Sequence, residues 1–264
     1  MGHSLWSKGA NLFESMISVF QIYFDEKTKL HLEPEFIPYF NDTKDGYFEN
    51  SVIKKIHESK DTPDSEYIGI SSWKQRSKTN LTGKDILSKI KNDIEKGTAK
   101  DVYLYPPVNF IKKQEGIIPE GYAYNATIKA TDLWEDHRKI GYPHRDDVML
   151  NNSGVLPFNI FDGKWIYSHC NYWIAKREVL DKYCKEVLIP AINYFERPEV
   201  KEKMLPWYNH SHENKKYNSA LFTLEALFGS FLAHENYSYS YICKKKVKQE
   251  LKRINILGYQ RIAS

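Results

Sequence analysis

Short apolar runs alternate with amphipathic segments in the first hundred residues. Residues 17–24, 67–73 and 101–107 are rich in β-branched and aromatic side chains and are too short for stable helices, which indicates buried strands. Residues 47–59 and 81–97 carry apolar side chains at helical spacing. This strand–helix alternation predicts an α/β domain with a mainly parallel sheet.

The second of these helices has terminal signals of its own. Thr82 and Asp85 stand at the spacing of a capping box, in which each side chain satisfies a backbone N–H of the first turn. Gly97 follows the last apolar position and predicts the end of the helix.

The second half of the chain is predicted to be more helical. We expect a short helix at 131–139, a strand or strand pair at 163–175, and a helix from about 177 to 195 that Pro190 kinks or divides. Residues 217–234 form the most apolar segment, which predicts a core helix.

Composition fits a soluble globular protein. Of 264 residues, 41% are apolar and 27% charged, and no run reaches the roughly 18 apolar residues that a membrane helix needs. Three cysteines without CxxC spacing argue against a disulfide framework or a zinc site. We therefore expect no membrane span and a reducing, cytoplasmic location.

One domain accounts for most of this length. We predict that it spans residues 16–242, because the strong strand pattern begins directly after Met16. Residues 1–15 are expected to be a tag or a disordered leader, since they lack the pattern of a secretory signal. Residues 243–264 are expected to form a basic helix or tail.

The chain contains no phosphate-loop, dinucleotide, esterase, zinc-protease or kinase motif. Ligands of open parallel sheets bind beyond the carboxyl ends of the strands, and the segment after the strand at 67–73 is the most informative of these ends. If it stays extended, Lys74, Arg76 and Lys78 share one face and can neutralise a phosphate or pyrophosphate. The alternative is a solvated basic loop.

Four segments of the chain, taken in order, carry a family resemblance. QIYFDEKTKLHLEPEFIPYFN, YIGISSWKQRSKT, DVYLYPP and CNYWIAKREVLDKYC resemble a group of bacterial and phage glycosyltransferases of the GT-A fold, similar to capsular-polysaccharide and mannosyltransferase-like enzymes. The ordered matches cover residues 17–235, which is most of the chain.

The resemblance implies a glycosyltransferase whose donor, a UDP- or GDP-sugar, binds over the carboxyl ends of the strands. Tyr23 is a possible stacking face for the nucleoside, or alternatively a half-buried strand residue. The donor-binding residues expected on this basis are Gln21, Tyr23, Asp25, Ser72, Trp73, Lys74, Arg76, Lys78 and Asn171.

GT-A enzymes commonly hold a divalent metal with an Asp-x-Asp pair at a strand end, but the matching segment here, ISSWKQ, has no carboxylate. Fixed cations can offset the charge of a leaving diphosphate as Mg²⁺ would. We therefore predict that no metal cofactor is required. The alternatives are Mn²⁺ or Mg²⁺ bound by Asp101 alone or by the pair Asp146 and Asp147.

An inverting transferase needs a base that activates the acceptor hydroxyl. The sequence offers Glu135, Asp136, His137 and Asp147, although a solvated helix face or a turn explains the same residues. We expect a glycan acceptor. One alternative is a hydroxymethylated base in phage-type DNA, with the basic run 244–253 following the phosphates; another is a non-catalytic module that binds nucleotides or sugars.

Overall fold

A computed structural model describes most of the chain. It covers residues 16–42, 46–105, 144–160, 166, 168–204, 206–209, 215–218 and 220–243. The predicted leader at 1–15, the predicted helix at 131–139 and the basic tail from 244 onward lie outside the described residues, as do Glu135, Asp136 and His137.

A six-stranded mixed sheet forms the centre of the molecule, in the order β2-β1-β3-β5-β4-β8. Its strands are β1 (Ile17–Tyr23), β2 (Ile37–Phe40), β3 (Tyr67–Ser72), β4 (Val102–Leu104), β5 (Trp173–Lys176) and β8 (Tyr239–Tyr241). β5 runs antiparallel to both of its neighbours, and the other five strands share one direction. The predicted α/β class with a mainly parallel sheet is therefore confirmed, with one reversed strand inside the sheet.

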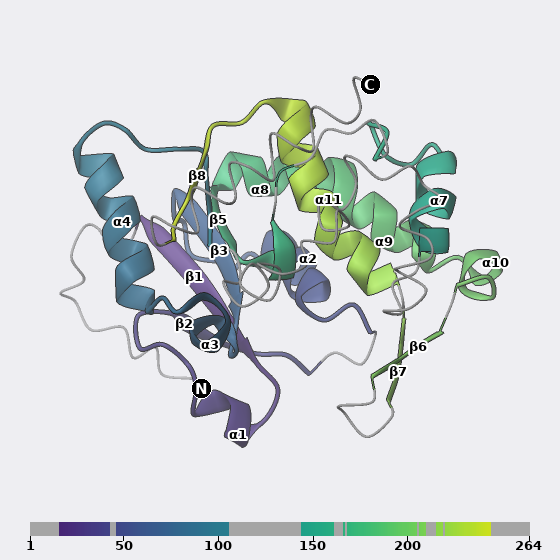
Figure 1. The fold of residues 1–264 in the computed structure, drawn as a ribbon, viewed down its shortest axis with the longest axis horizontal. Helices are drawn as coiled ribbons and strands as arrows, with labels where there is room; N and C mark the ends of the chain where they lie inside the picture. The colour runs from purple at the N-terminus through teal and green to yellow at the C-terminus, as the bar shows by residue number, and fades with distance from the viewer. Residues whose placement is uncertain are drawn as a thin grey trace, which may run out of the picture.

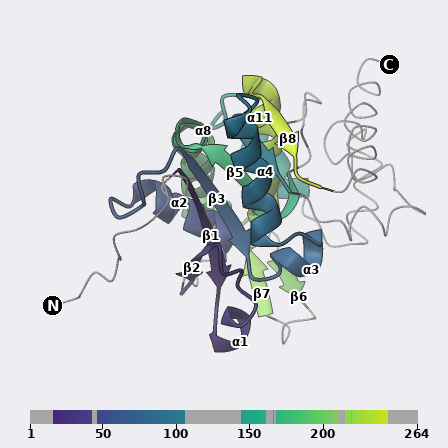
Figure 2. The ribbon, with the colours of Figure 1, turned by 90° about the vertical axis from the view of Figure 1, so that its left-hand side faces the viewer.

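Helices cover both faces of the sheet because successive strand residues point to opposite sides. Figure 1 shows α4 (Gly83–Glu95) on one side and α2 (Glu49–Glu58) with the later helices on the other; Figure 2 shows α4 lying along the sheet. Ile86 and Ile90 of α4 pack against Val19 and Ile174. The predicted capping box of α4 is present, and Gly97 follows the helix at a φ of 65°.

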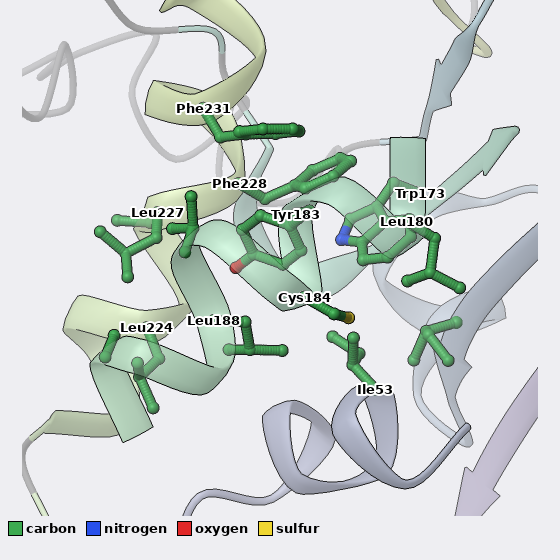
Figure 3. Packing of buried hydrophobic residues seen from close by; sticks show 14 of the residues in the cluster. Ile53, Trp173, Leu180, Tyr183, Cys184, Leu188, Leu224, Leu227, Phe228 and Phe231 are labelled. Carbon is green, nitrogen blue, oxygen red and sulfur yellow. The ribbon is translucent and has the colours of Figure 1, made fainter. Parts of the chain in front are cut away.

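The larger core lies on the face opposite α4 and is built around aromatic side chains (Figure 3). The ring of Trp173 in β5 stacks on Phe228 of α11 (Ala220–Glu235) with centroids 4.1 Å apart. Tyr183 meets both rings edge-on. Burial of such large side chains contributes most of the hydrophobic stabilisation, so this contact fixes α11 against the sheet.

The predicted helix 177–195 is continuous but irregular. It consists of α8 (Arg177–Tyr183), a π-helical segment (Cys184–Leu188) and α9 (Ile189–Phe195). Pro190 cannot donate a backbone hydrogen bond and its ring crowds the carbonyl four residues earlier. The wider π-helical segment directly before Pro190 relieves this conflict, so the helix is neither broken nor divided.

The remaining elements are short. They are α1 (Glu26–Lys29), α3 (Gln75–Thr79), α7 (His144–Asn152), the 3-10 turn η1 (His169–Asn171), α10 (Pro198–Lys201) and a separate antiparallel pair, β6 (Pro206–Asn209) with β7 (Lys215–Asn218). No helix in the described part of the chain is long and apolar enough to cross a bilayer.

Candidate functional site

Four segments that are distant in the sequence meet at the edge of the sheet where β1, β2 and β3 end. They are the start of α2, the β3–α3 segment, the turn η1 that precedes the reversed strand β5, and α11. Their polar side chains form a group that we call the strand-end cluster: Glu49, Lys74, Lys78, Cys170, Tyr172 and Glu225.

The segment after β3 is not extended, so the condition under which Lys74, Arg76 and Lys78 would share one face is not met. Residues Gln75–Thr79 form the short helix α3, held by the Gln75 amide, which donates to the Thr79 hydroxyl at 2.8 Å and to the Leu81 carbonyl at 3.0 Å. Residues four apart on a helix share a face. Lys74 and Lys78 therefore face the cluster together.

Arg76, which stands between the two lysines, points elsewhere. Its guanidinium lies 3.7 Å from the buried carboxylate of Glu33, and the Arg76 side chain is 68% exposed. The same Glu33 carboxylate accepts the backbone N–H of Gly83 at the start of α4. Because α3 is helical, Arg76 does not share a face with Lys74 and Lys78, as it would in an extended chain.

Lys78 is the most enclosed of the three cations. Its Nζ atom lies 3.3 Å from Cys170 Sγ and 5.5 Å from the centre of the Tyr172 ring. Burial alone would lower the pKa of Lys78, but Cys170, Glu225 and Glu49 outweigh it and raise that pKa. Lys78 therefore stays protonated, and its charge is held in partly desolvated surroundings.

Lys74 lies beside an aromatic ring rather than a carboxylate. Its Nζ atom is 4.9 Å from the centre of the Trp73 ring, a cation–π distance. Burial and the charge of Lys78 lower the pKa of Lys74, while Glu49 opposes the shift. An incoming anion would relieve this repulsion between the two lysines.

The turn before β5 has an uncommon backbone. The backbone φ angles of Cys170 and Asn171 are both positive, at 68° and 53°, a range that residues other than glycine rarely adopt. The Cys170 N–H donates to the Glu225 carboxylate, and the Asn171 amide donates to Asn50 Oδ1 at 3.3 Å. These two bonds join the turn to α11 and to the first turn of α2.

Burial raises the pKa of the Cys170 thiol to about 12.

Two of the predicted donor residues have structural partners instead. Gln21 is fully buried, and its amide donates to the Ser72 carbonyl at 3.1 Å and accepts the Glu33 N–H at 2.6 Å. Asp25 caps α1 by accepting the Thr28 N–H at 2.7 Å, and these hydrogen bonds lower its pKa. Both amide atoms of Gln21 therefore have partners within the protein, and its role in donor binding stays a prediction.

Two predicted aromatic residues remain partly exposed at the strand ends. Tyr23, at the end of β1, lies against Phe40 with ring centroids 5.4 Å apart. Trp73, directly after β3, lies 5.6 Å from the ring of His31. Ser72 precedes Trp73 and is buried, with its hydroxyl 2.6 Å from that of Tyr172.

Asp147 has a structural partner in α11. It is buried in α7, where its carboxylate accepts the hydroxyl of Thr223 and ties α7 to α11. Asp146 is buried beside it, so these residues belong to a packed helix and not to a turn. This contact gives Asp147 a packing role, and its catalytic role stays a prediction.

The described residues offer no obvious metal site. Nowhere in these ranges do three His, Cys, Asp or Glu side chains gather as metal ligands would. Asp101 lies at the opposite edge of the sheet, before β4, and is bound to Lys176 and Ser238. It therefore cannot serve the strand-end cluster as a lone ligand.

Two carboxylates of the cluster escaped the predictions. Glu49 is the first residue of α2 and lies within the predicted helix 47–59, and nothing in its sequence neighbourhood distinguishes it from a solvent-facing residue. Glu225 interrupts the apolar segment 217–234, which signals a buried partner, and the partner is the Cys170 N–H. Only the fold brings both carboxylates to the lysines.

No family model, curated protein or solved structure matches this chain.

Proposed function

We propose that the protein is a glycosyltransferase that uses a nucleotide-diphosphate sugar, with the diphosphate bound by Lys74 and Lys78. The observation that carries this proposal is the position of the two lysines, one helical turn apart, directly after a strand of a mainly parallel sheet. Ligands of such sheets bind beyond these strand ends.

The charge of the cluster suits a diphosphate leaving group. The pKa of Lys78 is raised, and Lys74 carries a second charge on the same helical face. Fixed, partly desolvated cations stabilise charge that develops on a departing phosphate without the cost of reorganising solvent. A metal ion is not needed for this step, although Mn²⁺ or Mg²⁺ can accompany the donor.

The neighbouring aromatic side chains fit the nucleoside part of the same donor. Tyr23 ends β1 and Trp73 directly follows the adjacent parallel strand β3, and both residues are partly exposed. A nucleobase stacks on such faces at a gain of roughly 1–3 kcal/mol. The donor would then run from the aromatic side chains of β1 and β3 toward the two lysines.

A screen of nucleotide sugars tests the proposal. UDP-, GDP-, CMP- and dTDP-sugars are added with and without Mn²⁺ while the unfolding temperature is followed, and the consumed donor is assayed as free or transferred sugar. We expect one nucleotide class to raise the unfolding temperature and to be turned over, since a ligand that binds only the folded state stabilises it.

Each of the other outcomes has a definite meaning. Stabilisation without turnover, even with glycans or DNA offered as acceptor, favours the non-catalytic binding module. Retention of hydroxymethylated DNA that is lost steeply as salt rises favours the DNA acceptor over the glycan. No stabilisation by any nucleotide sugar contradicts the proposal.

A further inference from the structure

We infer that Glu49 is the base that accepts the proton of the acceptor hydroxyl, an inference that rests on the proposed function. In this step the acceptor O–H gives its proton to the Glu49 carboxylate while the acceptor oxygen bonds to the anomeric carbon. The bond from that carbon to the diphosphate breaks, and its electron pair leaves with the diphosphate beside Lys74 and Lys78. Every atom and charge in the step comes from donor, acceptor or these side chains.

The position of Glu49 is set by a strained backbone and two contacts around the start of α2. Phe48, the residue before it, has φ 48° and ψ −117°, a backbone conformation typical of glycine. The Phe48 ring lies edge-on to Phe24 at 6.2 Å, and Asn50, the residue after Glu49, accepts a hydrogen bond from Asn171. Strain of this kind persists only where the surroundings hold it. Glu49 is therefore fixed toward the cluster.

The Glu49 carboxylate is free to receive a proton from outside the protein. The Glu49 residue is half-buried, and no side chain in the described part of the chain forms a hydrogen bond or an ion pair with its carboxylate. Glu225, by contrast, is already bound to the Cys170 N–H. Of the two carboxylates in the cluster, Glu49 is the one available for proton transfer.

A second observation at the same place points to a polar ligand. Asn171 is 2% exposed, and its side-chain Oδ1 atom has no hydrogen-bond partner among the described residues. Buried polar atoms are seldom left unpaired. The Asn171 amide donates to Asn50, the residue next to Glu49. A ligand hydroxyl bound beside Glu49 can therefore donate a hydrogen bond to Asn171 Oδ1.

Burial and the neighbouring charged groups act together on the pKa of Glu49. The charged or titratable groups around it are Lys74 beside α3, Lys78 of α3, Cys170 and Tyr172 next to β5, and Glu225 of α11. Burial and the repulsion of Glu225 raise the pKa of Glu49 above its ordinary value, against the opposing lysines. A carboxylate with a raised pKa is a stronger base once it is ionised.

The test separates donor binding from turnover in the full chain. UDP-glucose and GDP-mannose are titrated by calorimetry, and their hydrolysis to free sugar is followed against pH, with water as acceptor. We expect Glu49→Gln to keep the donor Kd within threefold and to lower the hydrolysis rate by at least about 100-fold, the usual contribution of a general base. The wild-type rate should fall in acid as Glu49 is protonated, and that decline should vanish in the variant.

Two further variants keep the test decisive. Glu58→Gln changes the other end of α2, where Glu58 faces Lys54 at the surface, and should leave binding and rate unchanged. Glu49→Asp retains a carboxylate on a shorter side chain and should restore the acid decline at a rate below the wild type. If Glu49→Gln fails to fold, Glu49→Asp carries the test with at least tenfold slower turnover.

Failure of the inference differs from failure of the proposed function. Wild-type protein that neither binds nor hydrolyses any donor contradicts the glycosyltransferase itself. Wild-type turnover that Glu49→Gln retains, with or without tighter donor binding, overturns only the role of Glu49 and makes it a counter-ion of the lysines. Loss of donor binding in a folded Glu49→Gln protein overturns that role as well.

Discussion

The Nζ atom of Lys78 lies 3.3 Å from the Sγ atom of Cys170, although the two residues are 92 positions apart in the sequence. This contact joins the helix that follows β3 to the turn that precedes the reversed strand β5. It explains why Lys78 faces inward at the strand ends while Arg76, two residues away, turns out to Glu33.

The two cations of α3 should therefore differ in their effect on donor binding. Lys78→Ala is expected to weaken the binding of a nucleotide sugar by at least tenfold, or ~1.4 kcal/mol, because it removes an enclosed positive charge. Arg76→Ala should leave the Kd within about twofold, because its guanidinium is exposed and is directed at Glu33. Calorimetric titration of both variants checks this, and equal losses would contradict the assignment.

Cys170 should react slowly with alkylating agents despite its place in the cluster. Its pKa is raised to about 12 by burial, so the thiol stays protonated near neutral pH, and only the thiolate is a good nucleophile. Mass spectrometry after iodoacetamide treatment should show a rate that still climbs about tenfold per pH unit between about pH 7 and 9. A rate that levels off in that range would show an ordinary or lowered pKa.

Gly69→Ala should destabilise the fold from the middle of β3. An added Cβ would overlap the Ile174 side chain and come within 3.0 Å of the Trp173 carbonyl on the neighbouring strand. Overpacking of this kind costs about 1–3 kcal/mol. Urea unfolding measures the loss, and Ser88→Ala on the exposed side of α4 is the control. An unchanged midpoint for Gly69→Ala would show that the strands can separate at no cost.

Asp101 should make stability depend on pH. Burial favours its neutral form, but hydrogen bonds from Ser238 and Lys176 outweigh burial and lower the pKa. A lowered folded-state pKa means that the stabilisation is complete above the unfolded-state value of about 3.9 and is lost as the pH falls through the folded-state pKa.

Asp101→Asn tests that dependence. The variant should lose about 1 kcal/mol at pH 7, allowing for partial exposure, and its deficit should shrink below about pH 4. Asp61→Asn changes an exposed carboxylate and serves as the matched control. A deficit for Asp101→Asn that is constant from pH 7 to about pH 3 would show that the carboxylate charge is not the cause.

The helices and strands that were predicted correctly are those in which apolar side chains recur at the spacing of the buried face. β1, β3, α2, α4 and α11 lie close to their expected ranges because each buries side chains at the spacing of its own secondary structure. α3 was missed because side-chain hydrogen bonds of Gln75, and not an apolar stripe, hold it together.

The candidate site was harder to predict than the fold. Lys74 and Lys78 could be proposed because they directly follow a strand, where ligands of parallel sheets bind. The direction of β5 depends on long-range pairing that no local pattern encodes, and this reversal brings Cys170 to Lys78. Glu49 likewise acts on the lysines only because the fold brings the start of α2 to the strand ends.

The most direct test of the account is a crystal structure with UDP or GDP bound. We expect the diphosphate oxygens about 3 Å from the Nζ atoms of both Lys74 and Lys78, the usual length of a charge-assisted hydrogen bond, and the base against Tyr23 or Trp73. A nucleotide bound on another part of the molecule, with both lysines remote from its phosphates, would contradict the account.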